Sequence, residues 1–343
     1  MQDSIIRVEQ AIATIKKGGM VIMMDDEDRE NEGDLVYAAT FSTPELVNFM
    51  AKEARGLICA PITQEIASRL DLCPMVSHND SNHETAFTVS IDASSAKTGI
   101  SAAERHECIR KLAHPLSVKS DFVRPGHIFP LIAKEGGVLV RTGHTEGSVD
   151  LCRLAGLAPV AVICEIINDD GTMARRDDLE VFATKHKLPI VYISDIVAYR
   201  LANEKLITRE SEEEVEIFGA KTTLVVYKDH LGRTHKAIQF YKAHAVSNVK
   251  FHNIGLDSDL LLAPKRLEVL LKSIEYLKSN GGVLVLLDAQ VISHEQAKEF
   301  GVGAQILKDL GITQIRLLTT HTDTEFVGIG GFGLGVVEKI LIS

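Results

Sequence analysis

The sequence predicts a two-domain protein that is built from both helices and strands. Its 343 residues suggest two domains, and its 45% hydrophobic content suffices for ordinary buried cores. Helical and strand patterns alternate over the first two-thirds of the chain, until a charge-rich stretch at 203–216 interrupts them. We therefore expect a first domain at 1–202, a linker at 203–216 and a second domain at 217–343.

The first domain is expected to begin with a helix. Ser4 can cap a stripe of apolar residues at helical spacing, and Gly18-Gly19 ends it. The same spacing predicts further helices at 44–54, 101–113, 146–156, 177–187 and 194–202. Short apolar runs predict strands at 20–24, 57–62, 87–91, 138–142, 159–167 and 190–193.

The second domain continues the alternation. Strands are expected at 222–227 and 237–241, and a helix begins at Pro264. Asn280-Gly281-Gly282 ends that helix, because glycine is favoured just after a helix. A strand at 283–287, a helix at 293–310 and a strand at 315–318 complete the pattern.

Composition argues against several classes of partner. The chain has no tryptophan, 5% aromatic residues and a net charge of -10, so nucleic acid is not expected to bind. No segment approaches the roughly 18 uninterrupted apolar residues that span a bilayer, and the N-terminus does not resemble a signal peptide. We expect a cytoplasmic protein without a membrane partner, in which the five cysteines are reduced thiols.

The segment from Asp25 to Asp34 is the most informative part of the chain. Seven acidic residues surround Arg29 directly after the apolar run 20–24. Close carboxylates repel one another, and each buried carboxylate needs a cation or hydrogen-bond donors. A hard divalent cation takes oxygen ligands, and an arginine fork holds carboxylate or phosphate. The pattern indicates half of an active site, with a solvated acidic turn as the alternative reading.

Two further segments supply groups that suit a phosphorylated substrate. Thr98 to Arg105 carries hydroxyls and a glycine into a predicted helix, whose free N–H groups favour phosphate. Arg141 to Glu146, after the predicted strand 138–142, combines an arginine suited to phosphate with His144, which is a potential metal ligand. A serine cap and a plain turn are the structural alternatives.

Two more segments supply candidate acids and bases. His127 stands between Pro125-Gly126 and Pro130, and we expect it on a rigid loop, where it can move protons near neutral pH. Glu165 lies inside the apolar strand 159–167 and is either exposed on one face or a buried acid. The pattern alone does not choose between these roles and a structural one.

Taken together, the motifs resemble 3,4-dihydroxy-2-butanone 4-phosphate synthase. They occur in order over about residues 1–202, at 25–34, 98–105, 124–130, 141–146 and 164–174. The resemblance implies an α+β domain that forms homodimers, so we expect an α+β chain whose two domains each have a mixed sheet with packed helices. It also implies a lyase that converts D-ribulose 5-phosphate to 3,4-dihydroxy-2-butanone 4-phosphate and formate, in riboflavin biosynthesis.

The resemblance assigns roles by position. Glu30 and His144 would hold magnesium, with manganese as the alternative cation, and His127 and Glu165 would be essential to catalysis. The sugar phosphate would be contacted by Arg29, Glu30, Asp34, Arg141, Thr142, Gly143, His144, Thr145 and Glu165. The chemistry agrees, because enolisation needs a base and a cation for the enediolate. Phosphate held by Arg141, Thr145 and the turn with Thr98 and Ser101 would fix the substrate's orientation.

The second region resembles GTP cyclohydrolase II but departs from it at the catalytic parts. The resemblance is clearest at 302–312, 315–319 and 331–338. That family binds zinc through three cysteines, whereas this chain has no cysteine after Cys164. The family's Arg-Gln-Glu-Gly-Arg-Gly segment is replaced by Ala289-Gln290-Val291. We expect no zinc and no hydrolysis of GTP.

Two other functions fit parts of the sequence. An inactive sensor of a sugar phosphate or nucleotide would suit the second region, which lacks the catalytic residues of its family. Such a sensor should also have lost acidic residues from the first region, but all of them are present there. A bifunctional enzyme would need non-cysteine zinc ligands such as His244 and His252. The intact first-region motifs favour the lyase.

Overall fold

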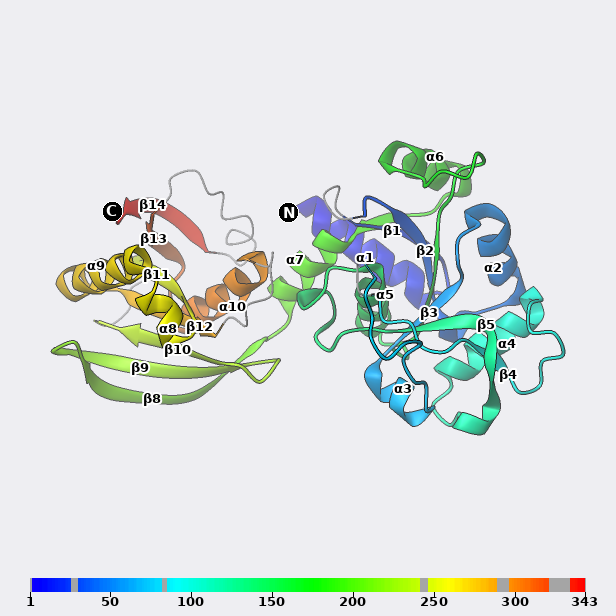
Figure 1. The fold of residues 1–343 in the computed structure, drawn as a ribbon. Helices are drawn as coiled ribbons and strands as arrows, with labels where there is room; N and C mark the ends of the chain where they lie inside the picture. The colour runs from blue at the N-terminus through cyan, green and yellow to red at the C-terminus, as the bar shows by residue number, and fades with distance from the viewer. Residues whose placement is uncertain are drawn as a thin grey trace. The chain divides into compact units, whose positions relative to one another are not determined.

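The computed structural model describes residues 2–25, 30–81, 85–240, 246–288, 296–320 and 334–342. The chain divides into two compact units, Met1–Tyr199 and Arg200–Ser343 (Figure 1). Over the described residues each unit has one seven-stranded sheet, which mixes parallel and antiparallel pairs. The expected α+β class, with a mixed sheet and packed helices in each part, is confirmed.

The first sheet brings the ends of three central strands to one edge. Its strand order is β4 (Ile91–Ala93), β5 (Phe122–Ile132), β3 (Cys59–Ile62), β6 (Ala161–Glu165), β2 (Gly33–Ala38), β1 (Val21–Met24) and β7 (Ile190–Tyr192). The antiparallel register places Met24 opposite Gly33 and Asp34 opposite Glu165. The end of β1, the start of β2 and the end of β6 therefore meet at the same edge.

Helices cover both faces of this sheet, which explains why its strands are apolar on both sides. One core contains buried residues of α1 (Gln2–Lys16), α5 (His144–Leu154) and α7 (Ile193–Asn203). The other core contains residues of α2 (Pro44–Phe49), the π-helical turn η2 (Met50–Ala54), α3 (Gln64–Arg69), α4 (Ala102–Ala113) and α6 (Arg176–His186). Within β1, Val21 and Met23 face the first core, whereas Ile22 and Met24 face the second.

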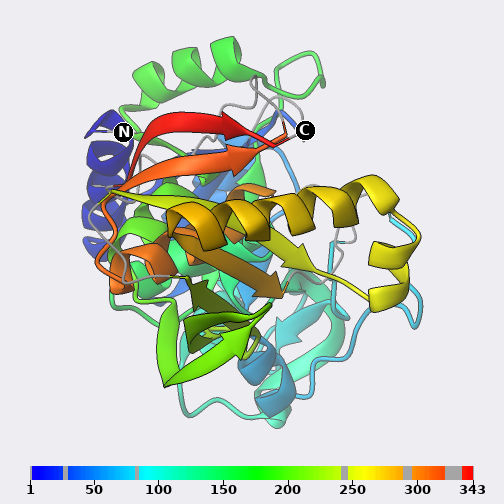
Figure 2. The same cartoon turned by 90° about the vertical axis from the view of Figure 1, so that its left-hand side faces the viewer.

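The second sheet has the order β14 (Gly335–Leu341), β13 (Gln314–Thr319), β11 (Val246–Ile254), β12 (Val283–Asp288), β10 (Thr234–Gln239), β9 (Ala220–Asp229) and β8 (Ile207–Ile217). Helix α9 (Pro264–Asn280) lies across its strands (Figure 2) and buries Ile274 and Leu277 against them. The short helix α8 (Asp257–Leu261) precedes α9, and α10 (Gln296–Asp309) packs against β12 and β8.

Three expected elements differ from the structure. The expected strand 138–142 is instead a 3-10 turn at Gly137–Leu139, because Gly136 and Gly137 both have positive φ angles (90° and 62°) that end an extended chain. The segment with His127, expected as a loop, belongs to β5. Most of the expected linker 203–216 forms β8, whose backbone pairs with β9 while its charged side chains are exposed. Charge therefore indicated solvent exposure here and not the absence of a strand.

The remaining differences are smaller. Strands β2, β11 and β14 and the short helix α3 were not expected from the sequence, and 87–91 contributes isolated bridges before β4. Among the described residues, no helix is long and apolar enough to cross a membrane.

Candidate active site

Asp25, at the end of β1, holds the residues of the acidic segment that directly precede β2. Asp25 is buried, and its two carboxylate oxygens accept the backbone N–H groups of Glu30 (3.1 Å) and Glu32 (2.8 Å). Asn31 takes a left-handed conformation (φ 53°), which turns the chain back into β2. Residues 26–29, and with them the expected substrate contact Arg29, lie outside the described residues. The loop thus holds Glu30 at the edge where β1, β2 and β6 meet.

His144 reaches the same edge from the first residue of α5. Its side chain is buried, and its Nδ1 atom lies 3.6 Å from Oε2 of Glu30. Ligand atoms of Asp25, Glu30 and His144 all lie within 4.8 Å of one another, and this is the one such trio found among the described residues. The structure therefore brings the two expected metal ligands together and adds Asp25.

These residues fit a divalent cation. Two ligands of an octahedral magnesium ion lie about 3.0 Å apart when adjacent and about 4.2 Å apart when opposite, given bonds of about 2.1 Å. The 3.6 Å separation of Glu30 and His144 falls between these values. That distance involves Nδ1 of His144, and the other ring nitrogen, Nε2, is buried and has no hydrogen-bond partner among the residues that the structure describes. An imidazole with an unsatisfied nitrogen and two carboxylates is a suitable donor set for a metal.

The electrostatics of the site point the same way. Burial lowers the pKa of His144, but the carboxylates of Asp34, Glu30 and Asp25 outweigh this effect and raise the pKa to about 9. Burial, together with repulsion from Glu165 and Glu30, raises the pKa of Asp34 to about 7 despite the opposing effect of His144. The site therefore has a negative potential that favours a bound cation.

Asp34 and Glu165 stand opposite each other on β2 and β6, beside this cluster. Asp34 is buried, whereas Glu165 is half-buried and accepts the backbone N–H of Leu57 through Oε2 (2.8 Å). Gly56 makes this close approach possible, because a β-carbon there would lie 2.4 Å from the backbone oxygen of Glu165 and 2.6 Å from that Oε2 atom. The sequence left open whether Glu165 is exposed or buried, and the structure answers with a half-buried carboxylate at the site edge.

His127 forms a second polar group with Asp92. Its Nδ1 atom lies 2.8 Å from Oδ2 of Asp92, and its backbone N–H donates to Oδ1 at 2.9 Å. His127 is exposed, with 42% of its side-chain surface accessible. His127 lies at an irregularity of β5, because Val123 pairs with Asp92 and Ile128 pairs with Ile91, so that residues 124–127 lie between these two pairs.

The segment 141–145 enters α5, with Gly143 as the cap residue before His144. The Arg141 guanidinium donates to the buried Glu146 (2.7 Å), so its fork is held in place. Thr145 is buried in the first turn, and Thr142 and Gly143 lead the chain into it. Residues 141–143 and Thr145 lie beside His144 because they are its neighbours in the chain.

Thr98 and Ser101 are engaged within their own turn. Both hydroxyls donate to Oε2 of Glu104, at 3.0 and 2.9 Å. The backbone N–H of Lys97 and the Ser101 hydroxyl, with further help from Thr98, lower the pKa of Glu104 to about 2. The Glu104 carboxylate thus occupies the position beside Thr98 and Ser101 where a phosphate was expected.

Several residues at the site were not singled out from the sequence. Arg175, just before α6, donates through Nη1 to the carbonyls of Glu30 and Asn31, both at 2.6 Å. Asp92 stands among serines and short apolar residues, so the sequence offers no signal there like the apolar run around Glu165. Arg175 had no comparable signal, because its partners are backbone atoms far away in the sequence.

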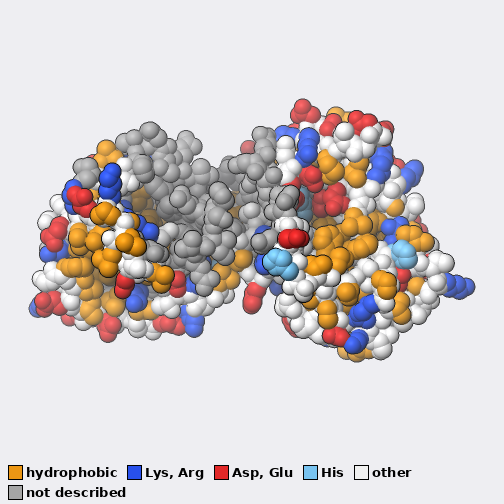
Figure 3. Space-filling model, viewed as in Figure 1, with side chains coloured by type: hydrophobic (Ala, Val, Ile, Leu, Met, Phe, Trp, Pro, Cys, Tyr) orange, Lys and Arg blue, Asp and Glu red, His pale blue; other side chains and the backbone are white. Residues whose placement is uncertain are grey.

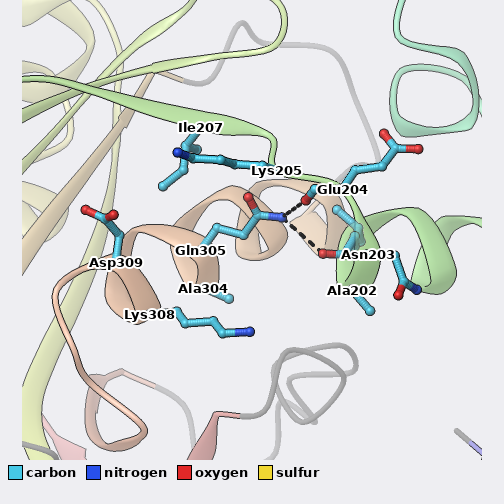
Figure 4. A pocket seen from close by; sticks show the side chains of 10 residues that line it. Ala202, Asn203, Glu204, Lys205, Ile207, Ala304, Gln305, Lys308 and Asp309 are labelled. Carbon is cyan, nitrogen blue, oxygen red and sulfur yellow. Dashed lines mark hydrogen bonds between the residues drawn. The ribbon is translucent and has the colours of Figure 1, made fainter.

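The second unit holds a cavity of about 500 Å³ whose lining includes none of the expected site residues. Figure 4 shows the Gln305 side chain beside it, where its amide donates to the carbonyls of Leu201 (3.1 Å) and Glu204 (2.7 Å). Of the two histidines considered as zinc ligands, His244 lies outside the described residues. Burial, with Arg266 and Lys250, lowers the pKa of His252 to about 4.

Comparisons with known proteins also match the two parts of the chain to two different families. The family model described as 3,4-dihydroxy-2-butanone 4-phosphate synthase matches residues 9–199, and the model described as GTP cyclohydrolase II matches residues 289–341. A curated 3,4-dihydroxy-2-butanone 4-phosphate synthase of Wolinella succinogenes is 57% identical over 337 residues, which cover 98% of this chain and 97% of that protein.

Two solved structures are also similar. The crystal structure of RibBX, a two-domain 3,4-dihydroxy-2-butanone 4-phosphate synthase from A. baumannii, has a TM-score of 0.81 and 39% identity, and the match covers 98% of this chain and 99% of that one. A synthase of the same description in complex with two magnesium ions has a TM-score of 0.54 and 46% identity, over 56% of this chain and 95% of that chain.

Proposed function

The chain belongs to the 3,4-dihydroxy-2-butanone 4-phosphate synthase family of biosynthetic lyases, and from this premise we propose its reaction and site. The substrate is D-ribulose 5-phosphate, and the products are 3,4-dihydroxy-2-butanone 4-phosphate and formate. The reaction supplies the four-carbon unit of riboflavin. The observation that carries the proposal is the trio Asp25, Glu30 and His144 at the meeting edge of three strands.

Glu30 and His144 hold a divalent cation, with Asp25 fixing the loop that presents Glu30. Magnesium is the cation favoured by the oxygen-rich donor set, and manganese is the alternative. Such a cation supplies Lewis-acid stabilisation of the enediolate that forms from a ketose. The solved relative with two magnesium ions supports this assignment.

His127 and Glu165 move the protons. The reaction needs a base for a C–H proton and an acid for the departing hydroxyl, and the two residues exchange these roles as the skeleton rearranges. Glu165 is held by the Leu57 N–H and lies opposite Asp34, which suits a group that contacts the sugar hydroxyls.

The phosphate end of the substrate is anchored at the start of α5. Arg141, Thr142 and Thr145 offer a guanidinium and two hydroxyls there, Gly143 is the cap residue of the helix, and Arg29 and Asp34 complete the proposed contacts. For Thr98 and Ser101 to bind phosphate, the Glu104 carboxylate would have to leave their hydroxyls. We therefore give the α5 segment the main anchoring role.

We further propose that the protein acts as a homodimer and that its second unit neither binds zinc nor hydrolyses GTP. Figure 3 shows apolar side chains gathered over one face of the first unit, and its exposed large apolar residues include Leu57, Met75, Val76, Leu116, Val118 and Val123. Exposed apolar surface of this kind favours a protein–protein interface. The loss of the three cysteines supports the absence of zinc chemistry.

The test is formate release from ribulose 5-phosphate by the purified full-length protein. We expect release with magnesium and none after EDTA treatment, and Glu30→Ala or His144→Ala should abolish it. Glu65→Gln, an exposed change on α3, serves as the control and should match wild type. Turnover that persists in EDTA would refute the metal role, and wild-type rates in both alanine variants would refute the residue assignment.

A further inference from the structure

The pair formed by Asp92 and His127 is tighter than a chance surface contact. Both carboxylate oxygens of Asp92 are used on this one residue, one by the backbone N–H at 2.9 Å and the other by the ring at 2.8 Å. Asp92 is 7% exposed, and a buried carboxylate is costly unless it is hydrogen-bonded. The backbone contact alone would already connect β5 to β4, so the ring contact calls for a separate explanation.

Two glycines make room for this pair. Gly99 has a φ of +78°, and a β-carbon there would collide with the Asp92 carboxylate and lie 2.6 Å from Nδ1 of His127. A β-carbon on Gly126 would collide with the backbone of Ile91 and Asp92. The turn at 99 and strand β5 thus both approach Asp92 as closely as the chain allows.

We propose that Asp92 is a positioning residue for His127, an inference that rests on the proposed function, in which His127 moves protons. A carboxylate only accepts hydrogen bonds, so the ring proton lies on Nδ1, and Nε2 keeps the lone pair that takes a substrate proton. The carboxylate also stabilises the imidazolium that exists until Nε2 returns this proton to the departing hydroxyl. The exposed imidazole leaves room for a substrate to approach.

The tautomer can be measured without any turnover. Long-range ¹H–¹⁵N spectra of the ¹⁵N-histidine protein, with the His127 signals assigned by their loss in His127→Gln, should report a proton on Nδ1 in the wild type. In Asp92→Asn the His127 signals should move towards a mixture of tautomers, because an amide can donate as well as accept. A wild-type proton on Nε2, or unchanged signals in Asp92→Asn, would overturn the inference.

Kinetics then separate positioning from simple support of the fold. Asp92→Asn should lower kcat about 100-fold or more, within the range of general acid–base catalysis, while KM stays within about threefold. The split between kcat and KM marks a positioning role when kcat is counted per folded molecule, because a change that only weakened the fold would lower the amount of active protein and not this constant. Asp71→Asn is the control, since Asp71 pairs with the exposed Lys119 and its left-handed conformation (φ 53°) accepts asparagine.

One kinetic result would contradict the inference, namely an Asp92→Asn variant with kcat within about threefold of wild type. If the wild type releases no formate, the proposed function fails, whereas the tautomer measurement still decides the inference about Asp92.

Discussion

Replacing Arg175 by methionine should weaken cation binding although Arg175 is not a ligand. The guanidinium donates through one nitrogen to the carbonyls of Glu30 and Asn31, both at 2.6 Å, and so ties the acidic loop to the start of α6. Methionine keeps much of the side chain's apolar length but removes both hydrogen bonds. The loop should then sample positions in which Glu30 is turned away from His144.

The expected size follows from these contacts. A hydrogen bond from a charged donor contributes about 1.5–3 kcal/mol when it is shielded from water. The Arg175 side chain is 47% exposed, so solvent screening reduces the pair to about 1–2 kcal/mol in total. If the free energy that favours the ordered loop falls by this amount, the dissociation constant of the cation rises about 5–30-fold.

The assay is a titration with Mn²⁺, in which electron paramagnetic resonance reports the free ion, followed by competition with Mg²⁺. Arg69→Met is the matched control, because Arg69 also donates to backbone carbonyls, those of His114 (3.4 Å), Pro115 (2.6 Å) and Ser117 (2.9 Å), within a different part of the first unit. Its affinity should stay within about twofold of wild type. An Arg175→Met variant that binds Mn²⁺ as tightly as the control would refute the reasoning.

Three further predictions follow from other contacts. Gly56→Ala should push the end of β6 and the Glu165 carboxylate away and lower kcat for formate release, since its β-carbon would lie 2.4 Å from the backbone oxygen and 2.6 Å from Oε2 of Glu165; unchanged kcat would contradict the proposed role of Glu165. In the second unit, burial alone would raise the pKa of Asp229, but hydrogen bonds from His235 and Arg233 hold it below its usual value, so its stabilising effect is present above about pH 4 and is lost as the pH falls below that. Asp229→Asn should therefore lower the free energy of unfolding of this unit by about 1–3 kcal/mol at pH 7 in urea titrations, and the difference should shrink towards pH 3; a constant difference would refute the assignment. Incubation with GTP and zinc should yield neither formate nor pyrophosphate, and robust turnover of GTP would contradict the proposed loss of cyclohydrolase chemistry.

Much of the first unit could be predicted from local pattern. The strand before Asp25 and the helices at 101–113 and 177–187 agree with β1, α4 and α6, because their apolar spacing and caps are local signals. The meeting of Glu30 with His144 was predicted from motifs in order, and the structure brings the two within 3.6 Å. The proposed roles of these residues remain predictions.

Other features depend on contacts that the sequence does not display. Strand β2 begins inside the acidic motif, and the charged residues there gave no indication of a strand. The strand is nevertheless buried between β1 and β6. Strand β8 is exposed along most of its length and exists because its backbone pairs with β9. Arg175 and Glu104 act on backbone atoms or on hydroxyls of a neighbouring turn, and only the folded chain reveals those partners.

The most direct test of the whole account is to locate the cation itself. Crystals of the full-length protein grown with Mn²⁺ should give an anomalous-scattering peak that both a Glu30 carboxylate oxygen and a His144 ring nitrogen can reach, at about 2.0–2.3 Å from each. A well-occupied peak bound elsewhere, with Glu30 and His144 both free of metal, would contradict the central claim.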